Sequence, residues 1–372
     1  MSGRWGRLYN GETTIDFVGR RWWGFILSGI LVLATLVSLL FQGLNLGIDF
    51  EGGVAWEAPV KNGLTIDSAT AILEDNNIES RNAKVQTLGS GAGERIRLQV
   101  DDQTTEVRSA VQKSLADTAK VDVAEVSVSS VSSSWGRSIT IKAIRALLVF
   151  FLLVSMYIAW RFEWKMAIAA IMAMVHDVIV SVGVYSLLGF EVTPSTVIAL
   201  LTILGFSLYD TIVVFDKVHD NTSRFSASRV SYEDIVNVSM NQVLMRSLNT
   251  SLAAVLPVLS LLVLGSGVFG AVALQEFALA LFVGLLTGAY SSIFIATPLL
   301  SLLKSREPKF RSLIGQRSLK ADMTSLMQTG SSVSRKQSAR SGTDTTGATS
   351  TPVDAVTAVL SHPPRPRKKT RR

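Results

Sequence analysis

Six long apolar runs, each separated from the next by more polar sequence, make up about a third of the 372-residue chain. They lie at residues 22–41, 143–160, 166–188, 196–215, 247–264 and 277–303. As a helix rising about 1.5 Å per residue, each run spans nearly the whole of a bilayer core about 30 Å thick. The pattern predicts an α-helical polytopic membrane protein with six transmembrane helices. A cleavable signal peptide is the alternative for the first run, but this run is too long and no small-x-small cleavage site follows it.

Residues 43–140, between the first two runs, follow a different pattern. Strand-like runs at 54–60, 82–88, 95–100 and 123–131 alternate with helical patterns at 65–77 and 103–119. The order β-α-β-β-α-β predicts a small α+β domain of the ferredoxin-like type. The glycines of "GSGAGE" at 89–94 indicate a hairpin loop rather than a phosphate site, because no Gly-Lys-Ser/Thr and no helix follow them. The expected organisation is an arm (1–21), a first helix (22–42), the α+β domain (43–140), five further helices (141–303) and a tail (304–372).

Charge predicts the orientation in the membrane. Only 17% of residues are charged, against about a quarter in a soluble domain. Lys and Arg gather in the N-terminal arm, in the 161–165 turn and after residue 216, whereas the connections 189–193 and 265–276 contain none. By the positive-inside rule both termini are expected to be cytoplasmic and the α+β domain external, in a multi-pass membrane protein.

The tail from residue 304 is rich in Ser, Thr, Gly, Lys and Arg and ends "PPRPRKKTRR". This composition predicts disorder. Anionic lipid is its expected partner, at about 1 kcal/mol per basic residue, in preference to nucleic acid or ribosomal RNA. With no cysteine and three histidines, the chain offers neither disulfides nor a histidine-based zinc site, and no cofactor is expected.

Two aspartates interrupt the apolar runs. Asp177 follows His176 in the third run, and Asp210 lies in the fourth. Each opposes insertion by about 2.5 to 3.5 kcal/mol, and such acids usually face a bundle interior or an aqueous cavity on an ion path. The alternative is that they only join helices by hydrogen bonds. Both interpretations stay open for Asp177, whereas small polar neighbours, among them Ser207 and Thr211, favour a functional Asp210.

Arg246 begins the fifth run on the same expected side as Asp210. We expect the two side chains to face each other at similar depth. Burial favours the neutral carboxyl, whereas a nearby guanidinium favours the ionised form. A conformational change that alters their separation therefore changes the proton affinity, which is what a proton-coupled machine requires.

Four segments together resemble the signature segments of the SecF family, auxiliary subunits of the bacterial Sec protein-export translocase. They are "GIDFEGG" at 47–53, "WRFEWKMAIAAIMAMVHD" at 160–177, "LGFSLYDTIVVFDKVHDN" at 204–221 and "QVLMRSLNTS" at 242–251. They occur in the family's order and at similar spacing, and the resemblance covers about residues 15–305.

The resemblance implies that SecD adds six helices to form a bundle related to the resistance-nodulation-division transporters. It further implies that protons flowing through the pair move external domains, which promote translocation of preproteins and their release through SecYEG after the SecA motor has started it. The family's proton-coupling aspartate and arginine fall on Asp210 and Arg246. Tyr209 stands where the family commonly has asparagine, so water access there differs. Whether sodium replaces the proton stays open.

Two glycine motifs have expected structural roles. In "GIDFEGG", Gly47, Gly52 and Gly53 are expected to form a hinge, with Asp49 and Glu51 anchoring the external domain. A structural turn is favoured there over direct contact with substrate. The GxxxG pair at 284–288 is expected to pack against SecD.

Two rival functions remain: one half of a proton-driven small-solute exporter, and a passive scaffold of the translocase. The exporter needs a large external apolar cleft, for which about a hundred residues are too few. The scaffold predicts that Asp210 can be replaced by asparagine at little cost. No constellation of nucleophile, base and orienting group indicates an enzyme.

Overall fold

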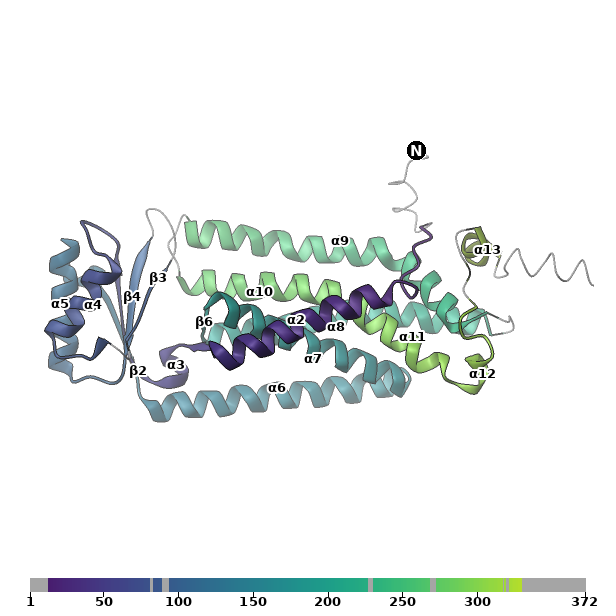
Figure 1. The fold of residues 1–372 in the computed structure, drawn as a ribbon, viewed down its shortest axis with the longest axis horizontal. Coiled ribbons are helices and arrows are strands. Elements are labelled where there is room, and N and C mark those ends of the chain that lie inside the picture. The colour runs from purple at the N-terminus through teal and green to yellow at the C-terminus, as the bar shows by residue number, and fades with distance from the viewer. Residues whose placement is uncertain are drawn as a thin grey trace, which may run out of the picture.

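The computed structural model describes residues 13–80, 83–88, 94–226, 230–267, 272–316, 318 and 321–329. Six helices long and apolar enough to cross a membrane lie side by side, and a small α+β domain sits at one end of them (Figure 1). The helices are α2 (Arg21–Phe41), α6 (Ser133–Arg161), α7 (Trp164–Leu188), α8 (Pro194–Arg224), α9 (Tyr232–Gly267) and a sixth made of α10 (Val272–Ser291), η4 (Ser292–Ala296) and α11 (Thr297–Ser305). The predicted fold class is confirmed.

Helices α8 and α9 are longer than the apolar runs that predicted them. α8 continues to Arg224 and α9 begins at Tyr232. Their polar extensions meet through buried side chains, since the Asn221 amide donates to Ser239 at 2.8 Å. Hydropathy marks the length that crosses hydrocarbon, and a helix can continue beyond it when a neighbouring helix satisfies its polar groups.

The α+β domain has the predicted order of elements. It consists of β2 (Gly53–Pro59), α4 (Ile66–Asp75), β3 (Lys84–Leu88), β4 (Arg95–Val100), α5 (Thr105–Ala119) and β5 (Ser127–Val131). The strands form an antiparallel sheet in the order β3-β4-β2-β5, as in a ferredoxin-like fold. Trp56, Leu73, Leu98 and Leu115 are fully buried in its core. Figure 1 shows α4 and α5 on the side of the sheet away from the helix bundle.

A short segment joins α2 to the domain. It contains β1 (Asn45–Leu46), which pairs in parallel with β6 (Glu191–Val192), and α3 (Ile48–Glu51). Gly52 and Gly53 follow with φ values of +85° and +117°. A Cβ on Gly53 would lie 2.3 Å from the Val100 carbonyl oxygen. The turn expected from "GIDFEGG" is therefore present, and it requires glycine both for its backbone angles and for the close approach of β4.

The C-terminal region is ordered further than the sequence predicts. Beyond α11, the helices α12 (Pro308–Arg311) and α13 (Ala321–Thr329) follow, and Met323 and Leu326 are buried in the core of the bundle. The disordered tail expected from residue 304 is thus wrong for the described residues up to 329. The average composition of the tail is polar and does not reflect these few apolar side chains, which are enough to pack a short helix against the bundle. The basic end of the tail, within 330–372, lies outside the described residues.

Replacing Gly53 by alanine tests the close approach of β2 to β4. We expect Gly53→Ala to destabilise the sheet by more than the roughly 1 to 3 kcal/mol of backbone strain alone, because its Cβ also meets Val100. Gly63→Ala is the matched control, since φ is +93° but a Cβ there would meet open space. Hydrogen exchange of the β2 and β4 amides measures both losses, and equal losses would contradict the steric part of this account.

Candidate functional site

Asp210 lies inside the helix bundle. Its side chain is on α8, which packs against α7, α9 and α10, and only 6% of the residue is exposed. The Ser292 hydroxyl donates a hydrogen bond of 2.8 Å to its Oδ2 atom. A cavity of about 20 Å³, lined partly by Asp210, Ser207 and Thr250, lies beside it. This volume is enough for one water molecule, so the carboxyl group has both a protein donor and room for water.

Asp177 is buried one helix away, on α7, with 1% of its surface exposed. Its Oδ2 atom accepts a hydrogen bond of 2.6 Å from the Ser207 hydroxyl, and its Oδ1 atom lies 3.3 Å from Nδ1 of His176. Ser207 precedes Asp210 by three residues, so both are on one face of α8. The two membrane acids are therefore arranged around the same short stretch of α8, and each is bonded to a serine from a neighbouring helix.

Arg246 does not pair with Asp210 in this conformation. The ion pairs formed among the described residues include none with Arg246, which is exposed on α9. Its Nη2 atom instead lies 3.4 Å from the Tyr209 hydroxyl. Consecutive residues of a helix point about 100° apart, so Tyr209 faces the surface while Asp210 and Thr211 are buried. The expected face-to-face contact is thus replaced by an approach through Tyr209.

The glycines of α10 bring it against α8. A Cβ on Gly284 would lie 2.2 Å from Ile203, and one on Gly288 would lie 2.9 Å from the Cβ of Ser207. The GxxxG pair expected to face SecD therefore packs within this chain instead. Small residues let two helix backbones approach closely. Because Gly288 packs closely against Ser207, Ser292, one turn further along, lies within hydrogen-bonding distance of Asp210.

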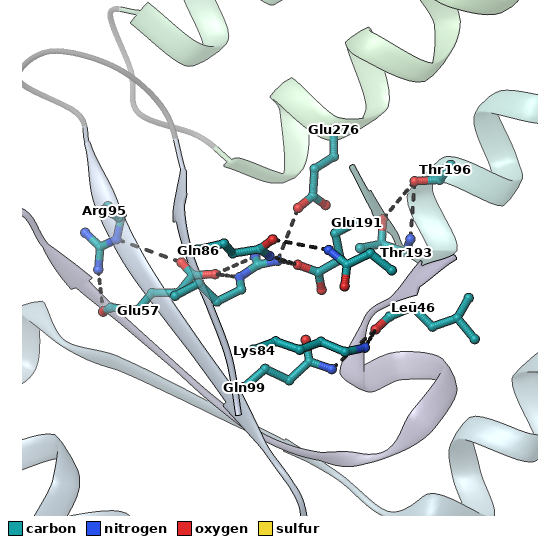
Figure 2. Close-up of polar contacts among 12 residues, drawn as sticks. Leu46, Glu57, Lys84, Gln86, Arg95, Gln99, Glu191, Thr193, Thr196 and Glu276 are labelled. Carbon is teal, nitrogen blue, oxygen red and sulfur yellow. Dashed lines mark hydrogen bonds and ion pairs between the residues drawn. The ribbon is translucent and has the colours of Figure 1, made fainter. Parts of the chain in front are cut away.

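A second polar site lies where the α+β domain meets the bundle. Arg97 on β4 binds three carboxylates: Glu57 of β2 at 2.5 Å, Glu191 of β6 at 2.5 Å and Glu276 of α10 at 3.2 Å. Figure 2 shows these three glutamates pointing toward the space between them. The Gln86 amide also donates to Glu191, at 2.6 Å. One guanidinium thus joins the sheet to two separate parts of the bundle.

The electrostatics of this junction favour a charged Arg97. Burial lowers its pKa, but Glu191, Glu57 and Glu276 together outweigh burial and raise the pKa of Arg97 above its usual range. Nearby, burial raises the pKa of the Asp49 carboxyl, and the attraction of Arg97 only partly opposes this. Both residues line a cavity of about 470 Å³ between the sheet and the bundle.

The segment "GIDFEGG" is held to this junction. Lys84 of β3 pairs with Glu51 at 2.8 Å and donates to the Leu46 carbonyl at 3.0 Å. The Gly47 amide donates to the Val192 carbonyl at 3.0 Å. Glu51 therefore anchors the domain as expected, whereas a hinge motion at Gly47, Gly52 and Gly53 stays a prediction.

The sequence alone did not indicate four residues of these two sites: Arg97, Glu191, Glu276 and Ser292. The available signal was an isolated acid in each of two short connections that otherwise lack charge, at 189–193 and 265–276. Their common partner is 94 and 179 residues away along the chain. Periodicity within a segment cannot bring such residues together.

Two family models match the chain. One, described as the C-terminal part of the protein export membrane proteins SecD/SecF, covers residues 110–306, and the SecD/SecF GG motif covers residues 37–54. The second match contains Gly52 and Gly53 of the turn described above. Together the two models include five of the six predicted helices in full and only the last few residues, from 37 onward, of the first.

Relatives and a solved structure agree with these matches. SecF of Streptomyces coelicolor is 42% identical, over 82% of this chain and 81% of that protein. SecDF of Thermus thermophilus is 33% identical over 76% of this chain, which spans 38% of SecDF. The crystal structure of SecDF from Thermus thermophilus, a translocon-associated membrane protein, superposes with a TM-score of 0.72 and 31% identity, covering 80% of this chain and 39% of that one. The chain belongs to the SecF family of protein translocase subunits.

Proposed function

We propose that this chain works with SecD to convert the proton motive force into movement that promotes preprotein translocation and release through the Sec channel. The observation that carries the proposal is Asp210, a carboxyl group buried among three helices with one serine donor and a water-sized cavity beside it. Acids placed this way in a membrane bundle usually mark an ion pathway or a proton relay. A membrane potential of 100 mV contributes about 2.3 kcal/mol for each proton that crosses.

Ionisation of Asp210 changes the partners that its carboxyl group needs. A buried carboxylate needs compensating donors or a nearby positive charge, whereas the neutral acid needs neither. The guanidinium of Arg246 lies 3.4 Å from the hydroxyl of Tyr209, the residue that precedes Asp210 on α8. We therefore place Arg246 as the group that approaches when Asp210 is ionised and withdraws when it is protonated. Three further residues have proposed supporting roles: Thr211 on α8, and His176 and Asp177 on α7.

SecD is the proposed partner within the membrane. The SecDF relative contains, in one chain, the region that matches this protein and a longer remainder. Phe206 and Tyr209, three residues apart on α8, are exposed, and the Tyr209 hydroxyl lies 3.4 Å from Arg246 of α9. We assign this face to SecD, with SecYEG, the SecA motor and the preprotein as partners of the assembled complex.

The proposed orientation places both termini in the cytoplasm. Arg161, Lys165 and Lys304 lie at turns and ends of helices on the side of the bundle away from the α+β domain. Lys165 pairs with Glu307 at 2.9 Å. The positive-inside rule then puts these groups in the cytoplasm and the α+β domain outside, in the bacterial plasma membrane.

The Arg97 junction is the proposed link between the membrane site and the external domain. α8, which carries Asp210, begins directly after Glu191 and Val192 of β6. The helix that carries Ser292 also carries Glu276 near its other end. A shift of α8 relative to α10 therefore moves Glu191 relative to Glu276, the two carboxylates of the bundle that share Arg97.

Asp210→Asn separates proton coupling from packing, because asparagine keeps the size and hydrogen bonding of aspartate but does not titrate. With SecD present in sealed vesicles, we expect the variant to lose the gradient-dependent increment of preprotein translocation and to keep the rate measured without a gradient. The control is Asp216→Asn on the same helix, where the side chain is 62% exposed. An increment that survives in Asp210→Asn would favour the passive scaffold.

Arg97→Gln tests the link between domain and bundle. Removing one partner from a buried ionic cluster destabilises the folded protein by about 3 to 5 kcal/mol. The Arg97 side chain is only 13% exposed, so this cost applies to it. We expect hydrogen exchange at the Gly47 amide to rise accordingly and the gradient-dependent increment to fall. Lys61→Gln, in a half-exposed pair with Glu125, is the control, worth less than about 1 kcal/mol. An unchanged increment in Arg97→Gln would place the coupling elsewhere.

A further inference from the structure

Ser292 occupies a special place beside Asp210. It is the first residue of η4, its exposed fraction is 0%, and its Oγ atom has two acceptors within reach. One is Asp210 Oδ2 at 2.8 Å, on another helix, and the second is the Ala289 carbonyl at 3.2 Å, on its own helix. Its single hydroxyl hydrogen can therefore be directed to either acceptor.

The number of hydrogens makes this choice depend on the protonation of Asp210. An ionised carboxylate only accepts, so the serine hydroxyl donates to it. A protonated carboxyl has a hydrogen to donate, and the serine oxygen can accept it once its own hydrogen turns to Ala289. The contact between Ser292 and Asp210 can then persist in both protonation states with its direction reversed, and no buried group loses its partner.

The wide helical turn η4 fixes Ser292 in this position. The Thr297 hydroxyl donates to the Ser292 carbonyl at 2.7 Å, and Pro298 has no amide hydrogen to offer the Phe294 carbonyl four residues earlier. A turn of this kind inserts one residue into a helix and often occurs at functional sites. The close contact of Gly288 with Ser207, one turn before, leaves α10 little room to move away.

The other charged or titratable groups around Asp210 are already engaged or lie further out. On α7, Asp177 is bonded to Ser207 and to His176. On α9, Arg246 contacts Tyr209 of α8. On α10, Tyr290 lies against the His176 ring and donates to the Gly24 carbonyl. Among the described residues, Ser292 is the direct side-chain hydrogen-bond donor to Asp210.

We propose that Ser292 is the positioning residue of Asp210: it donates to the ionised carboxylate, accepts from the protonated one, and so holds the acid in place beside the cavity through both halves of a proton cycle. The inference rests on the proposed role of Asp210 as a proton carrier. It assigns a task in addition to packing to the wide turn of the sixth helix, whose Ile293, Ile295 and Ala296 are buried in the core.

The test measures protonation of Asp210 directly, in the complex with SecD in lipid vesicles. A hydrophobic carbodiimide modifies protonated buried carboxyl groups, and mass spectrometry of the peptide gives the pH of half-maximal labelling. Ser292→Ala removes a hydrogen bond from both forms of Asp210, but the bond to the charged form is the stronger, so we expect this midpoint to rise by about one pH unit. Ser292→Thr, which keeps the hydroxyl, should restore the midpoint.

Two references separate this role from a structural one. Ser291 is equally buried, and among the described residues its hydroxyl donates to the Gly288 carbonyl, at 3.2 Å, and not to Asp210, so Ser291→Ala should leave the midpoint of Asp210 unchanged. Asp177, whose donor is Ser207, reports in the same sample and should keep its midpoint in Ser292→Ala.

Each contrary result has a distinct meaning. If Asp210 titrates but Ser292→Ala leaves its midpoint unchanged, or if Asp177 shifts equally, the positioning role is overturned while the proton-carrier role stands. If Asp210 resists labelling at every pH, the proposed function fails and this inference with it.

Discussion

A carboxyl group inside an apolar helix bundle must have hydrogen-bonding partners, and this constraint explains much of the structure. Asp177 and Asp210 obtain theirs from serines on adjacent helices. To bring those serines within reach, α10 must lie close to α8, and its glycines make that approach possible. The helix interface, the wide turn η4 and the small cavity all accommodate one buried acid, the proposed proton carrier Asp210.

The second constraint is that a membrane site can do mechanical work only if it is connected to something outside. The α+β domain is linked to the bundle by chain at both of its ends, through the glycine turn before β2 and through α6 after β5. Arg97 adds a third, non-covalent link, because it holds carboxylates from β6 and α10 at once. Buried ionic clusters contribute little net stability but depend strongly on geometry. Such a cluster is therefore suited to respond to small displacements of the helices beneath it.

The sequence predicted the elements of this fold well because each carries its own periodic signal. The six apolar runs, the βαββαβ order and the glycine turn at 52–53 were all evident from short segments. The buried position of Asp210 followed from the apolar residues around it. The helix α13 was not predicted, because it depends on a few apolar side chains such as Met323 within a largely polar stretch of sequence.

The sequence did not predict the contacts that give the site its chemistry. Arg246 was expected opposite Asp210, but its guanidinium lies against the hydroxyl of Tyr209 instead. The sequence alone does not show which of two consecutive side chains on α8 a residue of α9 contacts. The role of Ser292 could not be predicted, because a periodicity of about 3.6 residues assumes a regular sixth helix. The wide turn η4 changes the direction of the side chains relative to that regular helix. The Arg97 cluster joins segments far apart in the chain, and only the folded domain brings them together.

Distance measurements between the α+β domain and the bundle test most directly whether protonation of Asp210 moves the domain. The chain has no cysteine, so spin labels can be placed cleanly at exposed positions on the domain and the bundle, for example Lys113→Cys and Leu188→Cys. Pulsed electron resonance on the complex with SecD then gives their distance distribution at acidic and alkaline pH. The account predicts that the distribution changes with pH in the native protein and stays fixed in Asp210→Asn. A pH response that is absent from the native protein, or equal in both, would contradict it.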